Sequence, residues 1–211
     1  MFEKVLPKAT RHYLELLTQK GISAPFYLAG GSAVALHLGH RISVDLDFFN
    51  PESFDINSLE GELRSIPSYR RERIANDTLL GALEDLRISF FRYRYQLLEP
   101  PVVFLETHVL QLPDLAAMKI EAVSQRNAKR DFIDLYFLVH QAGISIQQAL
   151  EYHGAKYTGF DINKGHIILS LAYFDEADEE PMPRMLTPVK WADVKKFFQR
   201  ESRLLTKKMI E

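Results

Sequence analysis

A glycine–glycine–serine run at positions 30–32, followed thirteen residues after the serine by Asp45 and Asp47, constrains this chain more than any other feature. The run comes after a short apolar stretch, 26–29, that is typical of a strand. Glycine lets a backbone approach a ligand without an intervening Cβ, and free N–H groups at a helix start favour anions. The pattern therefore predicts a strand, a phosphate-binding turn and a helix, ahead of a second strand that carries the two acids.

The two acids suit a metal site. On a strand, Asp45 and Asp47 would point to the same side, about 7 Å apart. Val44, Leu46 and Phe48 would face the other way and pack into the core. Two like charges so close are unfavourable unless a cation compensates them, and oxygen ligands suit Mg²⁺ or Mn²⁺. The alternative is a pair of solvated carboxylates at a sheet edge.

Two residues near the acids also have two interpretations each. The Ser32 hydroxyl could donate to a phosphate oxygen, or it could cap a helix that runs to Leu38 and ends at Gly39. Arg41 could reach a phosphate or only brace the turn before the strand. Taken alone, these residues leave both alternatives open.

Composition excludes several classes of function. The 211 residues carry a net charge of −2, which argues against a strong general attraction to nucleic acid, although arginine clusters allow a local basic groove. Without cysteine there can be no disulfide, thiolate metal site or thiol nucleophile. No apolar run approaches the roughly 20 residues that span a bilayer, and residues 1–10 do not resemble a secretory signal. We therefore expect a cytoplasmic protein with no membrane partner.

Strand and helix patterns separate along the chain. The first half predicts helices over 7–20, 32–38 and 55–66, and strands over 26–29, 44–49, 69–75, 78–83, 86–95 and 102–105. The second half predicts helices that begin at 114 and 130 and others over 146–153, 163–172 and 191–208. The acids at 175–180 predict an exposed, extended loop. This segregation indicates an α+β fold, with a core domain over 1–111 and a helical C-terminal lobe over 112–211 that completes the cleft.

Two longer runs extend the pattern to most of the chain. The first, Leu28 to Phe49, reads LAGGSAVALHLGHRISVDLDFF, and the second, Asp114 to Leu138, reads DLAAMKIEAVSQRNAKRDFIDLYFL. Both resemble the AbiEii/AbiGii family of nucleotidyltransferase-like toxins, which belongs to the DNA polymerase β-like nucleotidyltransferases. The resemblance implies a polymerase β-like mixed sheet with flanking helices, and transfer of a nucleoside monophosphate from a nucleoside triphosphate with Mg²⁺ or Mn²⁺. It also implies RNA, such as transfer RNA, as an acceptor and an antitoxin protein as a partner.

The resemblance assigns roles to the first run by position. Asp45 and Asp47 would bind the metal and count as catalytic. By the same resemblance, Gly31 and Ser32 would contact phosphates. Together with Gly30 of the same turn and Arg41, they are the residues expected to bind the nucleotide.

The second run would add a cation and two acids to the same cleft. Lys119 matches a family lysine that would neutralise triphosphate charge, and Asp131 and Asp134 match the acidic pair of the last motif, so all three count as catalytic. Without the resemblance, simpler explanations would be better: a lysine that reaches along its helix to solvent, a first-turn acid at the helix dipole, and an ion pair with Arg130.

One expected acid is missing. Polymerase β-like enzymes usually carry a third carboxylate on a later strand, but the strand over 86–95 offers Arg87, Ser89 and Phe91 instead. The two acids just ahead of it are in the wrong register. Three options follow for the attacking hydroxyl: the acidic pair of the second run acts as base, a water or the substrate does so, or the protein binds a nucleotide and transfers poorly.

Two other functions stay open. The missing acid favours a catalytically weak or inactive module of the same fold that binds a nucleotide or a protein. An Asp-Leu-Asp run after a strand is also typical of phosphohydrolases with an aspartyl nucleophile. That function ranks last, because Phe49 stands where its chemistry usually requires a hydroxyl.

Overall fold

A mixed sheet organises one side of the molecule in the computed structural model, which describes residues 1–160 and 163–210. Its seven strands have the order β3-β4-β5-β2-β1-β7-β6. The strands are β1 (Tyr27–Leu28), β2 (Leu46–Asn50), β3 (Tyr69–Ala75), β4 (Thr78–Leu83), β5 (Leu86–Arg92), β6 (Val102–Phe104) and β7 (Thr107–Val109). The β2–β5 and β1–β7 pairs are parallel, and the other neighbouring pairs are antiparallel.

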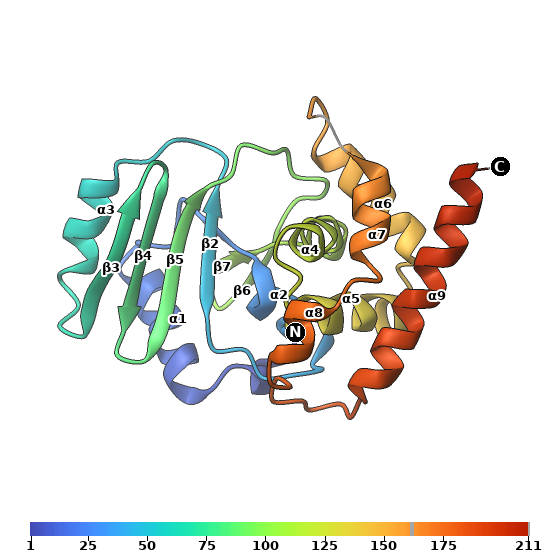
Figure 1. The fold of residues 1–211 in the computed structure, drawn as a ribbon. Coiled ribbons are helices and arrows are strands. Elements are labelled where there is room, and N and C mark those ends of the chain that lie inside the picture. The colour runs from blue at the N-terminus through green and yellow to red at the C-terminus, as the bar shows by residue number, and fades with distance from the viewer. Residues whose placement is uncertain (161–162, 211) are drawn as a thin grey trace.

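Helices fall into two groups. Those that accompany the sheet are the 3₁₀ turn η1 (Glu3–Val5), α1 (Lys8–Gln19), α2 (Gly30–Leu38) and α3 (Ile56–Leu63). Those that follow it are α4 (Leu112–Arg126), α5 (Lys129–Ala142), α6 (Ile146–Lys156), α7 (Lys164–Ser170), α8 (Asp175–Glu179) and α9 (Trp191–Ile210). Figure 1 shows the second group gathered beside the sheet, with α2 between β2 and α4. The predicted α+β class is confirmed, whereas the two-domain division at 111/112 stays a prediction.

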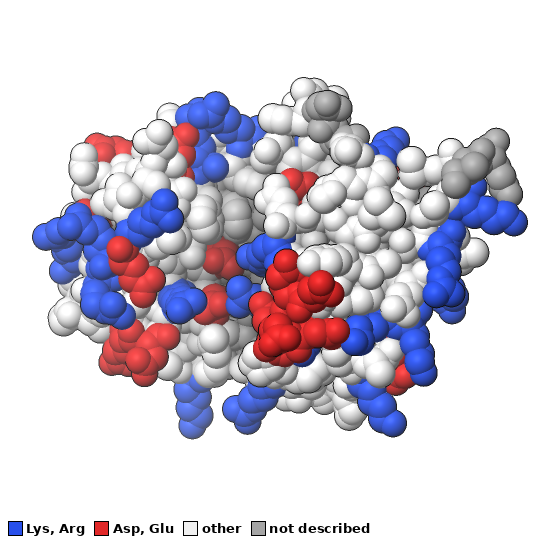
Figure 2. All heavy atoms as spheres, viewed as in Figure 1, with Lys and Arg blue, Asp and Glu red and all other residues white. Residues whose placement is uncertain are grey.

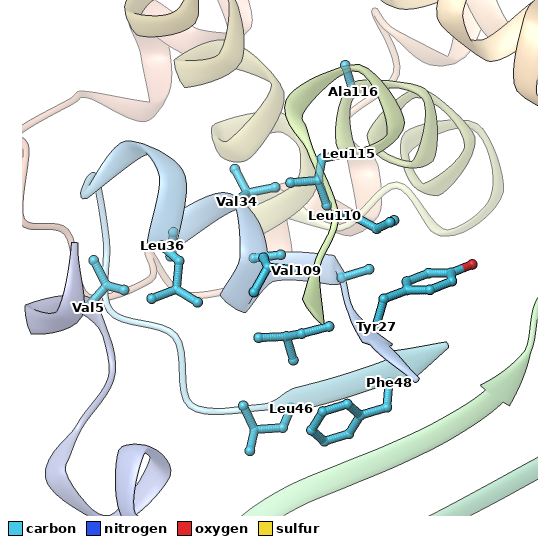
Figure 3. Close-up of a cluster of buried hydrophobic side chains, with 14 of the residues drawn as sticks. Val5, Tyr27, Val34, Leu36, Leu46, Phe48, Val109, Leu110, Leu115 and Ala116 are labelled. Atoms are coloured by element: carbon cyan, nitrogen blue, oxygen red, sulfur yellow. The ribbon is translucent and has the colours of Figure 1, made fainter. Parts of the chain in front are cut away.

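Helix α2 is a core element on all sides. Ala33, Val34, Ala35 and Leu36 are fully buried, and a helix that is apolar all round must lie inside a protein. It contacts β2 as well as α4 and α5. Figure 3 shows its side chains in one apolar cluster with those of β2, β7 and α4. The glycine turn at the start of α2 is therefore held between the sheet and the helices that follow it.

The strand that carries the acids begins later than predicted. β2 starts at Leu46, so Asp45 precedes it, and Leu46 and Phe48 are fully buried as expected. Val44 is 50% exposed, which makes its predicted core position wrong. The reason is that the preceding backbone bonds elsewhere: Ile42 N–H donates to the Arg184 carbonyl over 2.8 Å instead of joining the sheet.

Other element boundaries also need correction. α2 begins at Gly30 with Ala29 as its N-cap, so Ser32 lies within the first turn and the capping interpretation is wrong. The acid run is exposed but not extended, because Phe174 and Ala177 pack into the core and 175–179 close into α8. β7 was not predicted, since three residues are too few for a strand pattern. No helix in the described residues is long and apolar enough to cross a membrane.

A buried ion pair ties the helical part to the loop after β5. Lys156 Nζ lies 2.6 Å from Asp114 Oδ1, and neither side chain is exposed. Asp114 also accepts hydrogen bonds from the backbone N–H groups of Leu98 and Glu99, each 3.1 Å away. One carboxylate thus fixes the start of α4, the end of α6 and the loop after β5.

We expect Lys156→Ala to lower the free energy of unfolding by about 3–5 kcal/mol, because it leaves the Asp114 carboxylate buried without a cation. Urea unfolding measures the change. Lys20→Ala is the control: this exposed lysine only donates to Ser65, so its effect should stay within about 0.5 kcal/mol. Equal small losses in both variants would contradict the structural role of the pair.

Candidate active site

The serine turn and the two aspartates open into one cavity of about 330 Å³. The start of α2, the loop 41–45 and β2 form one part of its wall, and α4, α5 and the segment 183–184 form the rest. Its polar lining consists of Gly31, Ser32, Arg41, Ser43, Asp45, Asp47, Lys119, Arg126, Arg130 and Arg184. We call this space the first cavity.

A second cavity of about 350 Å³ shares part of this wall. Asp47, Lys119 and Arg126 line both spaces. The second cavity also has an aromatic side from the sheet and a polar side from α4. The residues that distinguish it are Gly30, Phe49, Phe91, Tyr93, Met118, Glu121, Ala122, Gln125 and Tyr157. A charged space thus adjoins an aromatic one, as a nucleotide with a triphosphate and a base would require.

Both glycines make room for functional side chains. Gly30 has a φ of +63°, and a Cβ there would come within 2.7 Å of Asp47 Oδ2. A Cβ on Gly31 would collide with Arg41 Nη2. The glycines are therefore needed for the close approach of Asp47 and Arg41, as well as for the turn itself.

Ser32 is buried and points at the backbone ahead of β2. Its hydroxyl donates to the carbonyl of Asp45, thirteen residues away. This bond couples the first turn of α2 to the acid-bearing loop. The hydroxyl proton is thereby engaged, which makes Ser32 a positioning residue for Asp45 in this structure.

The two acids differ in their surroundings. The Asp45 side chain is 30% exposed, and its Oδ2 lies 3.4 Å from Arg130 Nη1. Asp47 is half-buried on β2 and pairs in register with Ser89 of β5. Burial raises the pKa of Asp47 above its ordinary value, and the charge of Asp45 acts in the same direction. A hydrogen bond with Ser89 opposes this shift, as do the charges of Lys119 and Arg126.

The register identifies what replaces the third carboxylate. Ser89 stands beside Asp47 on the neighbouring parallel strand, so an acid at this position of β5 would lie on the same face of the sheet as Asp47. Glu84 and Asp85 are exposed in the turn between β4 and β5. The sequence predicted strand β5 correctly, but only its pairing with β2 shows that Ser89 is the residue next to Asp47.

Asp131 and Asp134 form a buried ionic network behind the first cavity. Neither side chain is exposed, and within the described residues neither lines the first or the second cavity. Lys119 Nζ joins them, at 2.6 Å from Asp131 Oδ1 and 2.7 Å from Asp134 Oδ2. The alternative of an Asp134–Arg130 ion pair is therefore wrong, and so is the alternative of a solvent-reaching Lys119, which is 4% exposed.

Two arginines and a histidine complete the network. Arg41 donates two hydrogen bonds to Asp134, of 2.6 and 2.8 Å, and His40 Nε2 lies 2.8 Å from the same carboxylate. Arg126 donates two hydrogen bonds to Asp131, of 2.7 and 2.9 Å. The sequence did not indicate that His40 belongs to the network, because its partner Asp134 lies 94 residues away along the chain.

These partners decide the charge of both buried acids. Burial by itself raises the pKa of Asp134, but the charges of Arg41 and Lys119, with hydrogen bonds from Arg41 and His40, hold it well below its ordinary value. For Asp131, burial is likewise outweighed by Lys119 and Arg126, and its pKa is lowered. Acids held in the charged form by such partners are poor proton acceptors. Their geometry indicates that they position Arg41, Lys119 and Arg126 in the cavity wall.

A distant segment closes the first cavity. The N–H groups of Leu186 and Thr187 donate to the His40 carbonyl, and Arg41 and Met185 form an isolated β-bridge. This pairing brings Pro183 and Arg184 to the cavity. In Figure 2, basic and acidic side chains meet in the hollow at the middle of the molecule, next to the exposed acids of α8.

The donors present fit a divalent cation that completes its shell from a substrate. Among the described residues, no group of three or more His, Cys, Asp or Glu side chains could hold a metal. Asp45 and Asp47 offer two carboxylates at one cavity, and Mg²⁺ is commonly held by one or two carboxylates together with waters and phosphate oxygens. The raised pKa of Asp47 reflects a burial cost that such a cation would offset.

We expect Gly31→Ala to lower the free energy of unfolding by about 1–3 kcal/mol, since the new Cβ displaces an Arg41 guanidinium that Asp134 holds in a buried site. Thermal unfolding monitored by circular dichroism measures it. Gly61→Ala, in α3 with no atom near the added Cβ, should be neutral or stabilising by up to about 1 kcal/mol. Matching melting temperatures for the two variants would refute this account of Gly31.

Asp134→Asn should lower the free energy of unfolding at pH 7 by about 3–5 kcal/mol, and the difference from wild type should shrink as the pH falls below about 4. The sign follows from the lowered pKa of Asp134: its contribution is complete above the unfolded pKa and is lost as the pH falls toward the folded one. Urea unfolding at pH 7 and pH 3.5 tests this. A difference that does not depend on pH would contradict it, and exposed Asp193→Asn serves as the control.

Comparisons with known proteins agree with this geometry. The sequence profile described as nucleotidyl transferase AbiEii toxin, of a type IV toxin–antitoxin system, matches residues 13–106 and 90–207. The protein aq_aa25 of Aquifex aeolicus is 38% identical over 200 residues, covering 93% of this chain and 95% of its own.

Solved structures support the fold. A protein of H. pylori, provisionally called a nucleotidyltransferase, aligns with a TM-score of 0.57 at 15% identity, over 96% of both chains. MenT4, a nucleotidyltransferase toxin of Mycobacterium tuberculosis H37Rv, aligns with a TM-score of 0.50 at 15% identity, over 92% of this chain and 83% of its own. The predicted polymerase β-like arrangement, a mixed sheet with flanking helices, is confirmed. On the extent of the profile match and the identity to aq_aa25, this chain belongs to the AbiEii nucleotidyltransferase toxin family.

Proposed function

We propose that this protein transfers a nucleoside monophosphate from a nucleoside triphosphate to an acceptor in the presence of Mg²⁺ or Mn²⁺. One observation carries the proposal: the glycine turn, Asp45, Asp47 and a wall of cationic side chains open into one cavity. The membership of a nucleotidyltransferase family supports the class of reaction.

The triphosphate would lie against the cationic wall. Lys119 and Arg126 are held from behind by buried acids, so their positions are fixed before substrate binds. Preorganised donors of this kind stabilise charge that develops in a transition state. The first N–H groups of α2, at positions 30–32, have no intrahelical partner and add further donors for phosphate oxygens.

Asp45 and Asp47 would hold the cation. When bound, Mg²⁺ supplies Lewis-acid stabilisation of the phosphate charge and lowers the pKa of the attacking hydroxyl. The acceptor hydroxyl attacks the α-phosphorus, the bond to the β-phosphate oxygen breaks, and pyrophosphate leaves. The hydroxyl proton would pass to water or to the substrate, because Asp131 and Asp134 are committed to ion pairs away from the cavity.

For the acceptor we propose RNA, such as transfer RNA, and for the biological context a toxin that an antitoxin protein controls. The family description and the name of MenT4, a nucleotidyltransferase toxin, support this context. Exposed arginines on the sheet side, at positions 70, 71, 73 and 87, offer phosphate contacts. Since nucleoside triphosphates and RNA meet in the cytoplasm, we expect the protein to act there.

The test combines purified protein, labelled nucleoside triphosphates, Mg²⁺ and total RNA or transfer RNA. Asp45→Asn and Asp47→Asn should each reduce label transfer by about 100-fold or more, because each removes a carboxylate from the proposed metal site. Chelation of the metal should abolish transfer. Asp85→Asn, which removes an exposed acid of the β4–β5 turn, is the matched control and should retain full transfer. If no label moves, or if Asp45→Asn matches wild type, the proposal fails.

Ser89 favours a second candidate, a module of the same fold that binds a nucleotide but transfers it poorly. A hydroxyl beside Asp47 cannot accept a proton as a carboxylate would. Calorimetry that shows tight triphosphate binding without turnover would support this candidate. Ser89→Asp separates the two: a large gain in transfer by this variant would mean that the missing acid limits the wild-type protein.

A further inference from the structure

The cations of the first cavity differ in what holds them. Arg41 and Lys119 are buried and bond to Asp134, and Arg126 makes two hydrogen bonds to Asp131. The two acids that hold them lie behind the cavity wall. These three cations can therefore meet a ligand without giving up their partners.

Arg130 is held in a different way. Its guanidinium Nη1 lies 3.4 Å from Asp45 Oδ2, in the first cavity, and half of its side chain is exposed. A half-exposed pair at this distance is weak and easily exchanged. Among the described cations of the cavity wall, Arg130 is the one whose recorded carboxylate partner is also a proposed metal ligand.

A metal ion and the Arg130 guanidinium therefore compete for the same Asp45 carboxylate. In the metal-free protein, Arg130 offsets part of the repulsion between Asp45 and Asp47. A divalent cation at the same oxygen would repel the guanidinium and would have to displace it. A new anion in the cavity would give the displaced Arg130 another charged partner, and the serine turn that would receive phosphates lines the same space.

We propose that Arg130 is an exchangeable counter-ion that couples metal binding to nucleotide binding. It pairs with Asp45 when the site is empty and transfers to the triphosphate when metal and nucleotide bind together. This inference rests on the proposed function and adds to it a thermodynamic coupling between two ligands. Arg130 is thus a positioning residue that disfavours metal binding in the absence of substrate.

Mn²⁺ binding to the purified full-length chain tests the proposal without any turnover. Electron paramagnetic resonance measures the affinity for Mn²⁺ alone, and calorimetry measures the affinity for a non-reactive α,β-methylene triphosphate in excess Mn²⁺. Arg130→Gln should tighten binding of Mn²⁺ alone by about 5-fold or more and weaken binding of the analogue. Arg130→Lys should restore the wild-type preference, because it keeps the competing charge.

Arg184→Gln is the matched control, since it removes the same charge from the same cavity wall without touching Asp45. It should weaken binding of the analogue but change the affinity for Mn²⁺ alone by less than about 2-fold, as expected for an exposed charge screened by solvent. Equal effects of the two substitutions on Mn²⁺ alone, or weaker Mn²⁺ binding by Arg130→Gln, would overturn the proposal.

The outcomes separate this inference from the proposed function. If wild type binds Mn²⁺, Asp45→Asn abolishes that binding and Arg130→Gln behaves like Arg184→Gln, only the role of Arg130 is wrong. If neither wild type nor Arg130→Gln binds Mn²⁺, the metal site itself is wrong and both proposals fall. Melting temperatures of the variants show whether each remains folded.

Discussion

One buried carboxylate, Asp134, sets the geometry of the candidate site. Arg41, Lys119 and His40 all converge on it from the loop before β2 and from α4. A charge in a fully buried position is tolerated only when partners and hydrogen bonds compensate its loss of water. The same bonds that satisfy Asp134 therefore fix two cations in the cavity wall, and Lys119 extends the network to Asp131 and Arg126.

This arrangement divides the acids by task. Two acids lie behind the wall, where they hold cations in place, and two lie in front of it, where they face the cavity. The glycine turn links the two layers: Gly31 leaves space for Arg41 of the network, and Gly30 leaves space for Asp47 at the cavity. Because α2 is packed between the sheet and the helices, the positions of both glycines relative to Asp47 and Arg41 are fixed.

Local patterns predicted the fold well because they depend on nearest neighbours along the chain. Leu46 and Phe48 followed from strand alternation, and the end of α2 followed from Gly39, which adopts a positive φ. The predicted core position of Val44 and the capping interpretation of Ser32 were wrong for a common reason: the Arg184 carbonyl accepts from Ile42 N–H ahead of the strand, and the Ser32 hydroxyl donates to the Asp45 carbonyl. Neither contact has a local signature.

The site shows the same limit. Lys119 and Arg126 are seven residues apart on α4, a spacing that places them on one helix face, and both reach Asp131. Arg41 and Asp134 stand 93 residues apart, so no spacing rule connects them. The role of Ser89 depends on strand pairing, which a single sequence does not specify. The sequence was enough to match the acids to those of a family. Which of them face the cavity and which point into the buried network could be learned only from the structure.

The pairing of 184–187 with 40–42 also has a consequence for biosynthesis. A ribosome makes the glycine turn and the aspartates well before the segment 184–187 that closes their cavity. A nascent chain that has not yet reached this segment carries Asp45 and Asp47 without the residues that close the cavity over them. The closed cavity should thus form only after segment 184–187 has left the ribosome and has paired with 40–42.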